Sequence, residues 1–227
     1  IRTKEQFVQR VSQQLEVNHD SLLFLLNNDD ELEIYRLNKE NVLTVFIPNT
    51  YQFWWNTSAD EFMKRMYKEY RKFWDKNRME KAANMGLTPT EAGILASIVE
   101  EENHRTDEQA KIAGVYVNRL KKGMYLQADP TVKFALQDFG RKRLLYADLK
   151  VDSPYNTYRH AGLPPGPIRI PDPVCIDKVL NYEKHNYLFM CAKEDFSGYH
   201  NFAETAAGHG VNVNKYHHAL NVNKIKK

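Results

Sequence analysis

The chain has 227 residues, of which 42% are hydrophobic and 27% are charged. This length suffices for one large domain or a main domain with a small appendage, and the composition is that of a folded globular protein. The longest apolar runs, Leu22–Leu26 and Gly93–Val99, are far shorter than the roughly 18 residues of a membrane-spanning helix. These features exclude wholesale disorder and predict no bilayer-spanning segment within this sequence.

The formal net charge is +3, from 32 basic and 29 acidic side chains. The basic residues are scattered, apart from a short tail at Lys224, Lys226 and Lys227. A protein that binds duplex DNA normally presents a clustered basic face. We therefore expect no nucleic-acid partner.

The two cysteines, Cys175 and Cys191, match neither a Cys-x-x-Cys redox pair nor a zinc-ligand pattern. They are equally compatible with a disulfide bond in an oxidising compartment and with two free thiols. Histidines such as His200 and His209 have no familiar ligand spacing, and the sequence lacks a phosphate-binding loop and a Gly-x-Ser-x-Gly elbow. No metal and no cofactor is predicted.

The N-terminal part of the chain has the pattern of short helices joined by small connections. Thr3 is placed to cap the first of these helices, and Asp20 or Ser21 to cap the next. We predict a small helical lobe over residues 1–40, which belongs to the same module as a larger domain over residues 41–227.

An aromatic cluster follows the lobe, beside a turn at Pro48 and Asn49. Such a cluster usually belongs to a core, but stacked aromatic rings also hold sugars or bases. Ser58 then precedes an amphipathic helical pattern. The members of the cluster are Tyr51, Phe53, Trp54 and Trp55.

The clearest helix start lies at residues 88–91. Thr88, Pro89 and Glu91 supply an N-cap residue, a proline at the first helical position and the acid of a capping box. The apolar residues that follow define the buried stripe of this helix, and they are Ile94, Leu95, Ile98 and Val99. With an advance of about 100° per residue, the stripe is centred near roughly 70° from Ile94.

Three adjacent glutamates at the end of this helix have different predicted orientations. Glu102 falls at roughly 80°, on the buried stripe, whereas Glu100 falls at roughly 240° and Glu101 at roughly 340°. We expect Glu100 to be solvated, Glu101 to lie on the flank, and Glu102 to face the rest of the protein. Burial would raise the pKa of Glu102, as a general acid requires. The alternatives are a frayed helix end that exposes Glu102 to water, or an ion pair with Arg105 or Arg119.

A second helix start follows, with Thr106 and Gln109 in the positions of a capping box. An extended segment then leads to Asp129 and Pro130, where Asp129 is suited to be the N-cap of another helix. Further along, a loop at residues 153–173 contains six of the nine prolines, five of them within residues 164–173. Such a loop suits a rigid wall beside a cleft, and equally a connector between subdomains.

The last part of the chain combines a strand pattern with a helix. Tyr187–Ala192 is a strand-like run, Asn201 and Phe202 continue the sheet, and Val211–Leu220 predicts a closing helix. The predicted fold class is α+β: a helix-rich domain with a small sheet and a proline-rich cleft loop, preceded by the small helical lobe.

Several motifs in order resemble the endolytic murein transglycosylase family, also called YceG-like. They are residues 96–102 (ASIVEEE), 113–120 (AGVYVNRL), 126–132 (LQADPTV), 153–158 (SPYNTY) and 162–168 (GLPPGPI), with a weaker match at residues 46–51 (FIPNTY). The family's catalytic glutamate falls on Glu102. The sequence departs from the family at Glu101, where the family has lysine, and at Asn103 and Ala128, where it has threonine.

The resemblance implies a membrane-anchored enzyme with a larger catalytic domain over residues 41–227, acting on peptidoglycan at the extracytoplasmic, periplasmic face of the inner membrane. The implied single-pass anchor and most of a LysM-like module would precede this sequence. Association with the cell-wall synthesis machinery is also implied.

The implied reaction cleaves the bond between N-acetylmuramic acid and N-acetylglucosamine and leaves 1,6-anhydro ends, with Glu102 as acid and then base. Polar groups facing this acid would support the developing charge. The substrate-binding candidates are Gln127, Asp129, Tyr155, Asn156, Tyr158 and Pro164. Two alternatives stay open at this point: an ordinary glycoside hydrolase with a second carboxylate at Glu100, Asp129 or Asp152, and a non-catalytic peptidoglycan-binding module.

Overall fold

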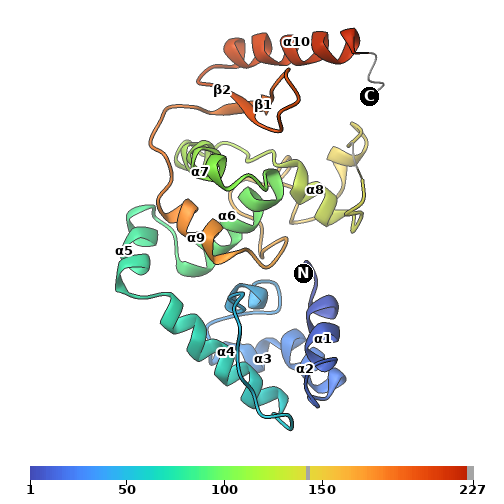
Figure 1. Ribbon diagram of the computed structural model, residues 1–227, viewed down its shortest axis with the longest axis vertical. Helices are drawn as coiled ribbons and strands as arrows, with labels where there is room; N and C mark the ends of the chain where they lie inside the picture. Colours follow the sequence, from blue (N-terminus) through green and yellow to red (C-terminus); the bar gives the residue numbers. More distant parts are fainter. Residues whose placement is uncertain (142–143, 224–227) are drawn as a thin grey trace.

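The computed structural model describes residues 1–141 and 144–223. Ten α-helices, two short 3-10 helices and one two-stranded sheet are formed by this part of the chain. Figure 1 shows the N-terminal helices at one end of the molecule, a helical centre, and the hairpin with the last helix at the opposite end. The predicted α+β class is confirmed.

The N-terminal end consists of α1 (Lys4–Ser12), α2 (His19–Asn27) and α3 (Asp29–Glu33). As predicted, the Thr3 side chain caps α1, but α2 is capped by Asn18 rather than by Asp20 or Ser21. The predicted lobe of residues 1–40 shares its hydrophobic core with the segment that follows, because Phe7 stacks on Phe46 at 4.0 Å between ring centroids.

Next come the 3-10 helix η1 (Val42–Val45), α4 (Ala59–Phe73) and α5 (Lys76–Asn84). A capping box between Ser58 and Glu61 begins α4 at the predicted place. The aromatic cluster before it divides: Phe53 packs against Phe62, whereas the residues Trp54 and Trp55 are 84% and 63% exposed.

The centre is built on α6 (Pro89–Glu102), which packs against α7 (Thr106–Lys121), α8 (Asp129–Ala135) and α9 (Pro173–Leu180). The Thr88 and Glu91 capping box begins α6 as predicted. The second predicted capping box is wrong: α7 begins without a side-chain cap, and the Gln109 amide donates instead to the carbonyl oxygen of Asn103.

The proline-rich loop runs along α6. The backbone amide of Ile168 donates to Ser97 Oγ at 3.1 Å, and the amide of Ile170 donates to the carbonyl oxygen of Ile1 at 2.9 Å. At Gly166 the loop comes so close to Glu40 that a Cβ atom would collide with its carbonyl oxygen. The loop therefore joins the N-terminal helices to the central helix. It is preceded by a short 3-10 helix, η2 (Asp148–Lys150).

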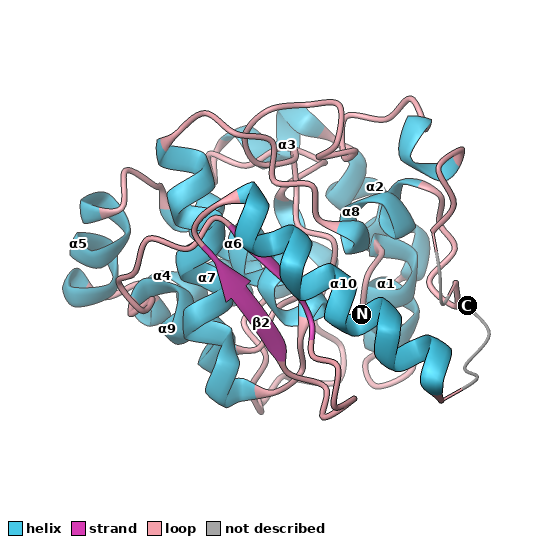
Figure 2. Ribbon diagram, turned by 90° about the horizontal axis from the view of Figure 1, so that it is seen from above, coloured by secondary structure: helices cyan, strands magenta, loops and turns pink. Residues whose placement is uncertain are grey.

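The C-terminal end has β1 (Phe189–Ala192) and β2 (His200–Ala203), followed by α10 (Ala206–Val222). The two strands pair antiparallel, with Cys191 opposite Asn201, and both the strands and the closing helix were predicted. From above, α10 lies across the hairpin (Figure 2). None of the described helices is long and apolar enough to cross a membrane. Cys175 and Cys191 are both free thiols, so the disulfide alternative is not realised.

Candidate active site

Glu102 is the last residue of α6. The helix places Ile94, Leu95, Ile98 and Val99 in the core, as the periodicity predicts. Asn103 then takes an extended conformation and ends the helix. Glu102 is thus held at a sharp corner between α6 and α7, where its side chain is largely surrounded by protein but the residue keeps some exposed surface.

Burial raises the pKa of Glu102. Smaller influences act in both directions: the charges of His200 and Lys133 lower the pKa, and the charge of Asp129 raises it. The hydroxyl of Tyr116 donates a 3.0 Å hydrogen bond to Oε2 of Glu102, which also favours the charged form. No ion pair reaches Glu102 within the described residues, so the alternative pairing with an arginine does not occur.

The other two glutamates of the triplet form ion pairs with arginines. Glu100 was expected to be solvated, but it is buried, pairs with Arg169 at 2.9 Å and accepts a hydrogen bond from the backbone amide of Asp172. Glu101 pairs with Arg2 at 2.9 Å and Arg169 at 3.0 Å. The prediction for Glu100 is wrong because the proline-rich loop covers the face of α6 that would otherwise meet water.

Asp129 and Tyr158 are brought together near Glu102. Asp129 is the first residue of α8 rather than its N-cap, which is Ala128, so its carboxylate is free to accept a hydrogen bond from the Tyr158 hydroxyl. Burial, followed by the contact with Asp129, raises the pKa of Tyr158. The charge of Glu102 contributes in the same direction, which links the pair electrostatically to the candidate acid.

Gln127 lies beside this pair in an unusual conformation. Its φ of 47° is in the left-handed region, its backbone amide donates to the carbonyl oxygen of Thr157 at 3.1 Å, and its side chain is exposed. Backbone strain at a non-glycine residue is frequent at functional sites. The geometry holds the Gln127 side chain out toward solvent.

The side chains of Asn156 and Tyr155 make hydrogen bonds to other parts of the protein. The buried Asn156 amide donates to the carbonyl oxygens of Leu149 and Val151, at 3.0 and 2.8 Å. The Tyr155 hydroxyl donates to Glu40 at 3.0 Å. Both side chains therefore fix the shape of the segment that carries Tyr158.

Pro164 lies far from Glu102. It lines a cavity of about 1250 Å³ together with Thr88 and Pro89, at the N-terminal end of α6. Since α6 has 14 residues, its two ends are about 20 Å apart. None of the other predicted site residues lines this cavity.

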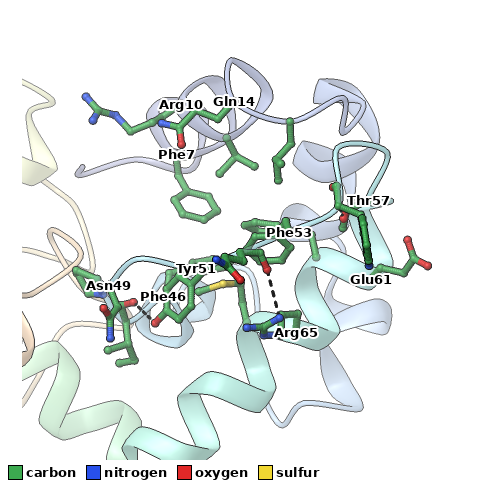
Figure 3. A pocket seen from close by; sticks show the side chains of 18 of the residues that line it. Phe7, Arg10, Gln14, Phe46, Asn49, Tyr51, Phe53, Thr57, Glu61 and Arg65 are labelled. Atoms are coloured by element: carbon green, nitrogen blue, oxygen red, sulfur yellow. Dashed lines mark hydrogen bonds between the residues drawn. The ribbon is translucent and has the colours of Figure 1, made fainter.

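The most aromatic of the four cavities described for this part of the chain does not include Glu102 in its lining. It has a volume of about 1140 Å³ and lies between α1, α4 and the segment around Phe53 (Figure 3). Phe7 and Phe53 face its interior, and Arg65 contacts its rim through a hydrogen bond to a backbone carbonyl. Glu102 lines none of the four cavities of 380–1250 Å³ described for residues 1–141 and 144–223.

Comparison with known proteins identifies the family. A model of the YceG-like family matches residues 1–215. The chain belongs to this family. The matched range includes every element described above, from α1 through most of α10.

Two relatives of this chain have the same name. A Bacillus subtilis protein named endolytic murein transglycosylase is 35% identical over 207 residues, which are 83% of this chain and 56% of the Bacillus protein. A Streptococcus pneumoniae protein of the same name is 36% identical over 110 residues, covering 47% of this chain and 20% of that protein. The chain thus spans about half, or less, of the length of these relatives.

A solved structure supports the fold. The crystal structure of a putative YceG-like protein from Listeria monocytogenes superposes with a TM-score of 0.74 at 29% sequence identity. The superposition covers 91% of this chain and 72% of the Listeria chain. The arrangement of helices around α6 is therefore shared with another YceG-like protein.

Arg119 contributes to the site in a way that the sequence did not predict. Instead of pairing with Glu102, its guanidinium donates to the carbonyl oxygens of Leu188 at 2.6 Å and Leu126 at 2.7 Å. Burial lowers the pKa of Arg119, and the residue is 8% exposed. It joins the hairpin to the segment before α8, and its chain neighbours gave no sign of these long-range partners.

Two further residues near the acid were also missed. Tyr116 belongs to the motif at residues 113–120, but its position in α7 does not reveal where its hydroxyl points. His200 showed no useful spacing to other histidines, since its partner is Glu108, 92 residues away in the sequence. A pattern within one helix or strand cannot reveal either contact.

Proposed function

We propose that this chain carries the catalytic part of an endolytic peptidoglycan lytic transglycosylase, with Glu102 as its acid and base. The observation that carries the proposal is the environment of Glu102. This glutamate has a pKa raised by burial, a tyrosine hydroxyl on one oxygen, and no ion pair among the described residues. The names of the Bacillus and Streptococcus relatives support the same reaction class.

The proposed reaction begins with proton donation. Protonated Glu102 gives its proton to the oxygen that links C1 of N-acetylmuramic acid to N-acetylglucosamine, and that C1–O bond breaks. The Glu102 carboxylate then accepts the proton of the muramyl 6-hydroxyl while this oxygen bonds to C1. The products are a 1,6-anhydromuramyl end and a free N-acetylglucosamine end, and no water is consumed.

A single carboxylate is sufficient for these two reaction steps, because the substrate supplies the nucleophile. The surroundings of Glu102 suit both of its states. Burial favours the protonated acid that starts the reaction, and the Tyr116 hydroxyl stabilises the carboxylate that follows. Glu100, one of the candidates for the second carboxylate of a hydrolase, is held by Arg169 and the backbone amide of Asp172, which argues against a role as a hydrolase nucleophile.

The remaining predicted site residues divide into two proposed roles. Gln127, Asp129 and Tyr158 are proposed to face the glycan, since they lie beside one another and two of them are electrostatically linked to Glu102. Tyr155 and Asn156 are proposed to act by shaping the loop. A role for Pro164 would require a glycan that extends along the length of α6.

Substrate and location follow from the same proposal. A peptidoglycan glycan strand lies outside the cytoplasmic membrane, so we propose that the chain acts on the extracytoplasmic side. A single-pass N-terminal anchor and contacts with the cell-wall synthesis machinery complete the proposal, as the family resemblance implies.

Digestion of purified peptidoglycan tests the function. The parent protein, Glu102→Gln and the matched control Glu101→Gln are each incubated with sacculi, and the soluble fragments are weighed by mass spectrometry. We expect the parent and Glu101→Gln to release fragments with anhydro ends, lighter by one water than hydrated ends, and Glu102→Gln to release none. Hydrated ends would favour a hydrolase, and intact sacculi that retain bound protein would favour a binding module. Full activity of Glu102→Gln would refute the assignment of the acid.

A further inference from the structure

A buried glutamate and a histidine form a pair beside Glu102. His200 is the first residue of β2, in the hairpin that packs on α7 beneath α10 (Figures 1 and 2). Its Nδ1 lies 2.7 Å from Oε2 of Glu108, a residue of α7. The two side chains are only 14% and 7% exposed, so the pair is shielded from solvent.

Additional hydrogen bonds fix this pair and tie it to Glu102. Oε1 of Glu108 accepts the backbone amide of His200 at 2.9 Å, and Oε2 also accepts the side-chain amide of Asn103 at 2.6 Å. Asn103 directly follows Glu102 in the chain. The imidazole and the residue next to the candidate acid thus share one carboxylate oxygen, which places His200 at the corner where α6 ends.

The contacts define how the imidazole is oriented. An ionised carboxylate only accepts hydrogen bonds, so Nδ1 of His200 must carry a hydrogen toward Glu108. Within the described part of the chain, Nε2 of His200 makes no hydrogen bond to protein. This nitrogen atom is not fully buried. Carboxylate partners commonly orient a histidine in this way at catalytic and metal sites.

Charged and titratable groups from four other segments surround Glu102. Glu100 and Glu101, on the same helix as Glu102, are occupied by Arg169 and Arg2. The groups contributed by the other segments are Tyr116 and Arg119 from α7, Asp129 and Lys133 from α8, Tyr158 from its loop and His200 from β2. Among the charges that favour the carboxylate form of Glu102, that of His200 has the largest influence on its pKa.

We propose that His200, held by Glu108, is a positioning residue that stabilises the carboxylate form of Glu102 once its proton has been donated. The inference rests on the proposed function, because it concerns the state of Glu102 between the acid step and the base step. A desolvated carboxylate is unfavourable without a nearby positive charge or hydrogen bond. Glu108 and the backbone contacts hold the imidazole in a fixed position near that carboxylate, without a direct ion pair between His200 and Glu102.

The test compares His200→Gln with a matched control, Tyr199→Phe. Tyr199 is the neighbouring residue, and its hydroxyl also ties the hairpin to α7 through a 2.7 Å hydrogen bond to Asp107. The Tyr199 variant therefore weakens the same contact between hairpin and helix without removing a charge near Glu102. The rate of anhydro-end formation is measured against pH for the parent and both variants.

We expect His200→Gln to lower kcat about tenfold, the effect of about 1.4 kcal/mol on the barrier, and to move the alkaline limb of the pH profile to higher pH. The direction follows because removal of a nearby positive charge makes Glu102 harder to ionise. Tyr199→Phe should leave the position of this limb unchanged, and His200→Lys should move it back toward the parent. An unshifted limb in His200→Gln, or an equal shift in Tyr199→Phe, would overturn the inference.

A second measurement needs neither activity nor a substitution at His200. The side-chain carboxyl carbon of Glu102 and the imidazole of His200 are followed by NMR in the parent protein from about pH 4 to pH 9. We expect the Glu102 signal to change wherever the imidazole signal changes with pH. A Glu102 titration that is independent of His200 overturns the inference even if anhydro ends are formed. Absence of anhydro ends from the parent would instead overturn the proposed function.

Discussion

Replacement of Glu102 by glutamine is predicted to stabilise the protein at neutral pH. Burial raises the pKa of Glu102 in the folded state above its ordinary value of 4.5, which approximates that of the unfolded chain. The protonated form therefore favours folding, and its contribution is complete below the unfolded-state pKa and is lost as the pH rises through the folded-state pKa. Glutamine keeps the neutral form at every pH.

The magnitude follows from the pH interval. Between pH 4.5 and the raised folded-state pKa, the parent loses about 1.4 kcal/mol of unfolding free energy per pH unit relative to the variant. Because roughly 2.5 pH units separate 4.5 from neutrality, the gain of Glu102→Gln at pH 7 has an upper bound of about 3.5 kcal/mol. For a chain of this size, that bound corresponds to a rise in Tm of roughly 7–14 °C.

Urea unfolding followed by circular dichroism at several pH values provides the assay. The two proteins should have equal unfolding free energies below about pH 4, and the Glu102→Gln variant should exceed the parent at pH 7. Glu101→Gln is the control and should be less stable than the parent at pH 7, because Arg2 and Arg169 lose a partner. Equal or lower stability of Glu102→Gln at pH 7 would show that the Glu102 carboxylate is not desolvated in the folded protein.

Three further predictions concern other positions. Tyr116→Phe should lower kcat about tenfold and move the alkaline limb of the pH profile upward, since a hydrogen bond to a charged group is worth about 1.5–3 kcal/mol and this one favours ionised Glu102. Thr88→Ala should lower the unfolding free energy, measured in urea, by about 1 kcal/mol through loss of its capping box with Glu91. Gly166→Ala should cost about 1–3 kcal/mol in the same assay, because its Cβ collides with a backbone carbonyl.

Each of these three predictions would be contradicted by a specific experimental result. Unchanged kinetics of Tyr116→Phe would mean that the tyrosine hydroxyl does not contact Glu102 during the reaction. Thr88→Ser keeps a hydroxyl and should retain most of the stability, so equal losses for Thr88→Ser and Thr88→Ala would argue against the cap. If Gly166→Ala is as stable as the parent, the loop does not pass as close to the N-terminal helices as the structure places it.

The elements that were predicted correctly are those specified by neighbouring residues. The α6 and α4 starts follow from capping boxes, whose two members are three residues apart, and the buried stripe of α6 follows from helical periodicity. The inward direction of Glu102 belongs to the same class of inference. A local pattern predicted these features because the interactions that produce them are themselves local.

The error at Glu100 occurred because a distant segment provided the decisive partner. Glu100 was placed correctly on the face of α6 opposite the stripe, yet the proline-rich loop brings Arg169 and the Asp172 amide to it from about 70 residues away. The Thr106 capping box failed for a different, local reason: the buried carbonyl oxygen of Asn103, six residues away, accepts the Gln109 side-chain amide. Periodicity gives the direction of a side chain, but not what lies in that direction.

The three glutamates at the end of α6 show how such partners separate chemically identical side chains. Glu100 and Glu101 are both held by Arg169, so their charge is structural and joins α6 to the loop and to Arg2. These same contacts engage Arg2 and Arg169 with other carboxylates, and Arg119 is engaged with carbonyl oxygens. Glu102 is then buried without a permanent counter-ion. A carboxyl group in that condition favours its protonated form, which the proposed acid step requires, whereas both neighbours are engaged in ion pairs with arginine.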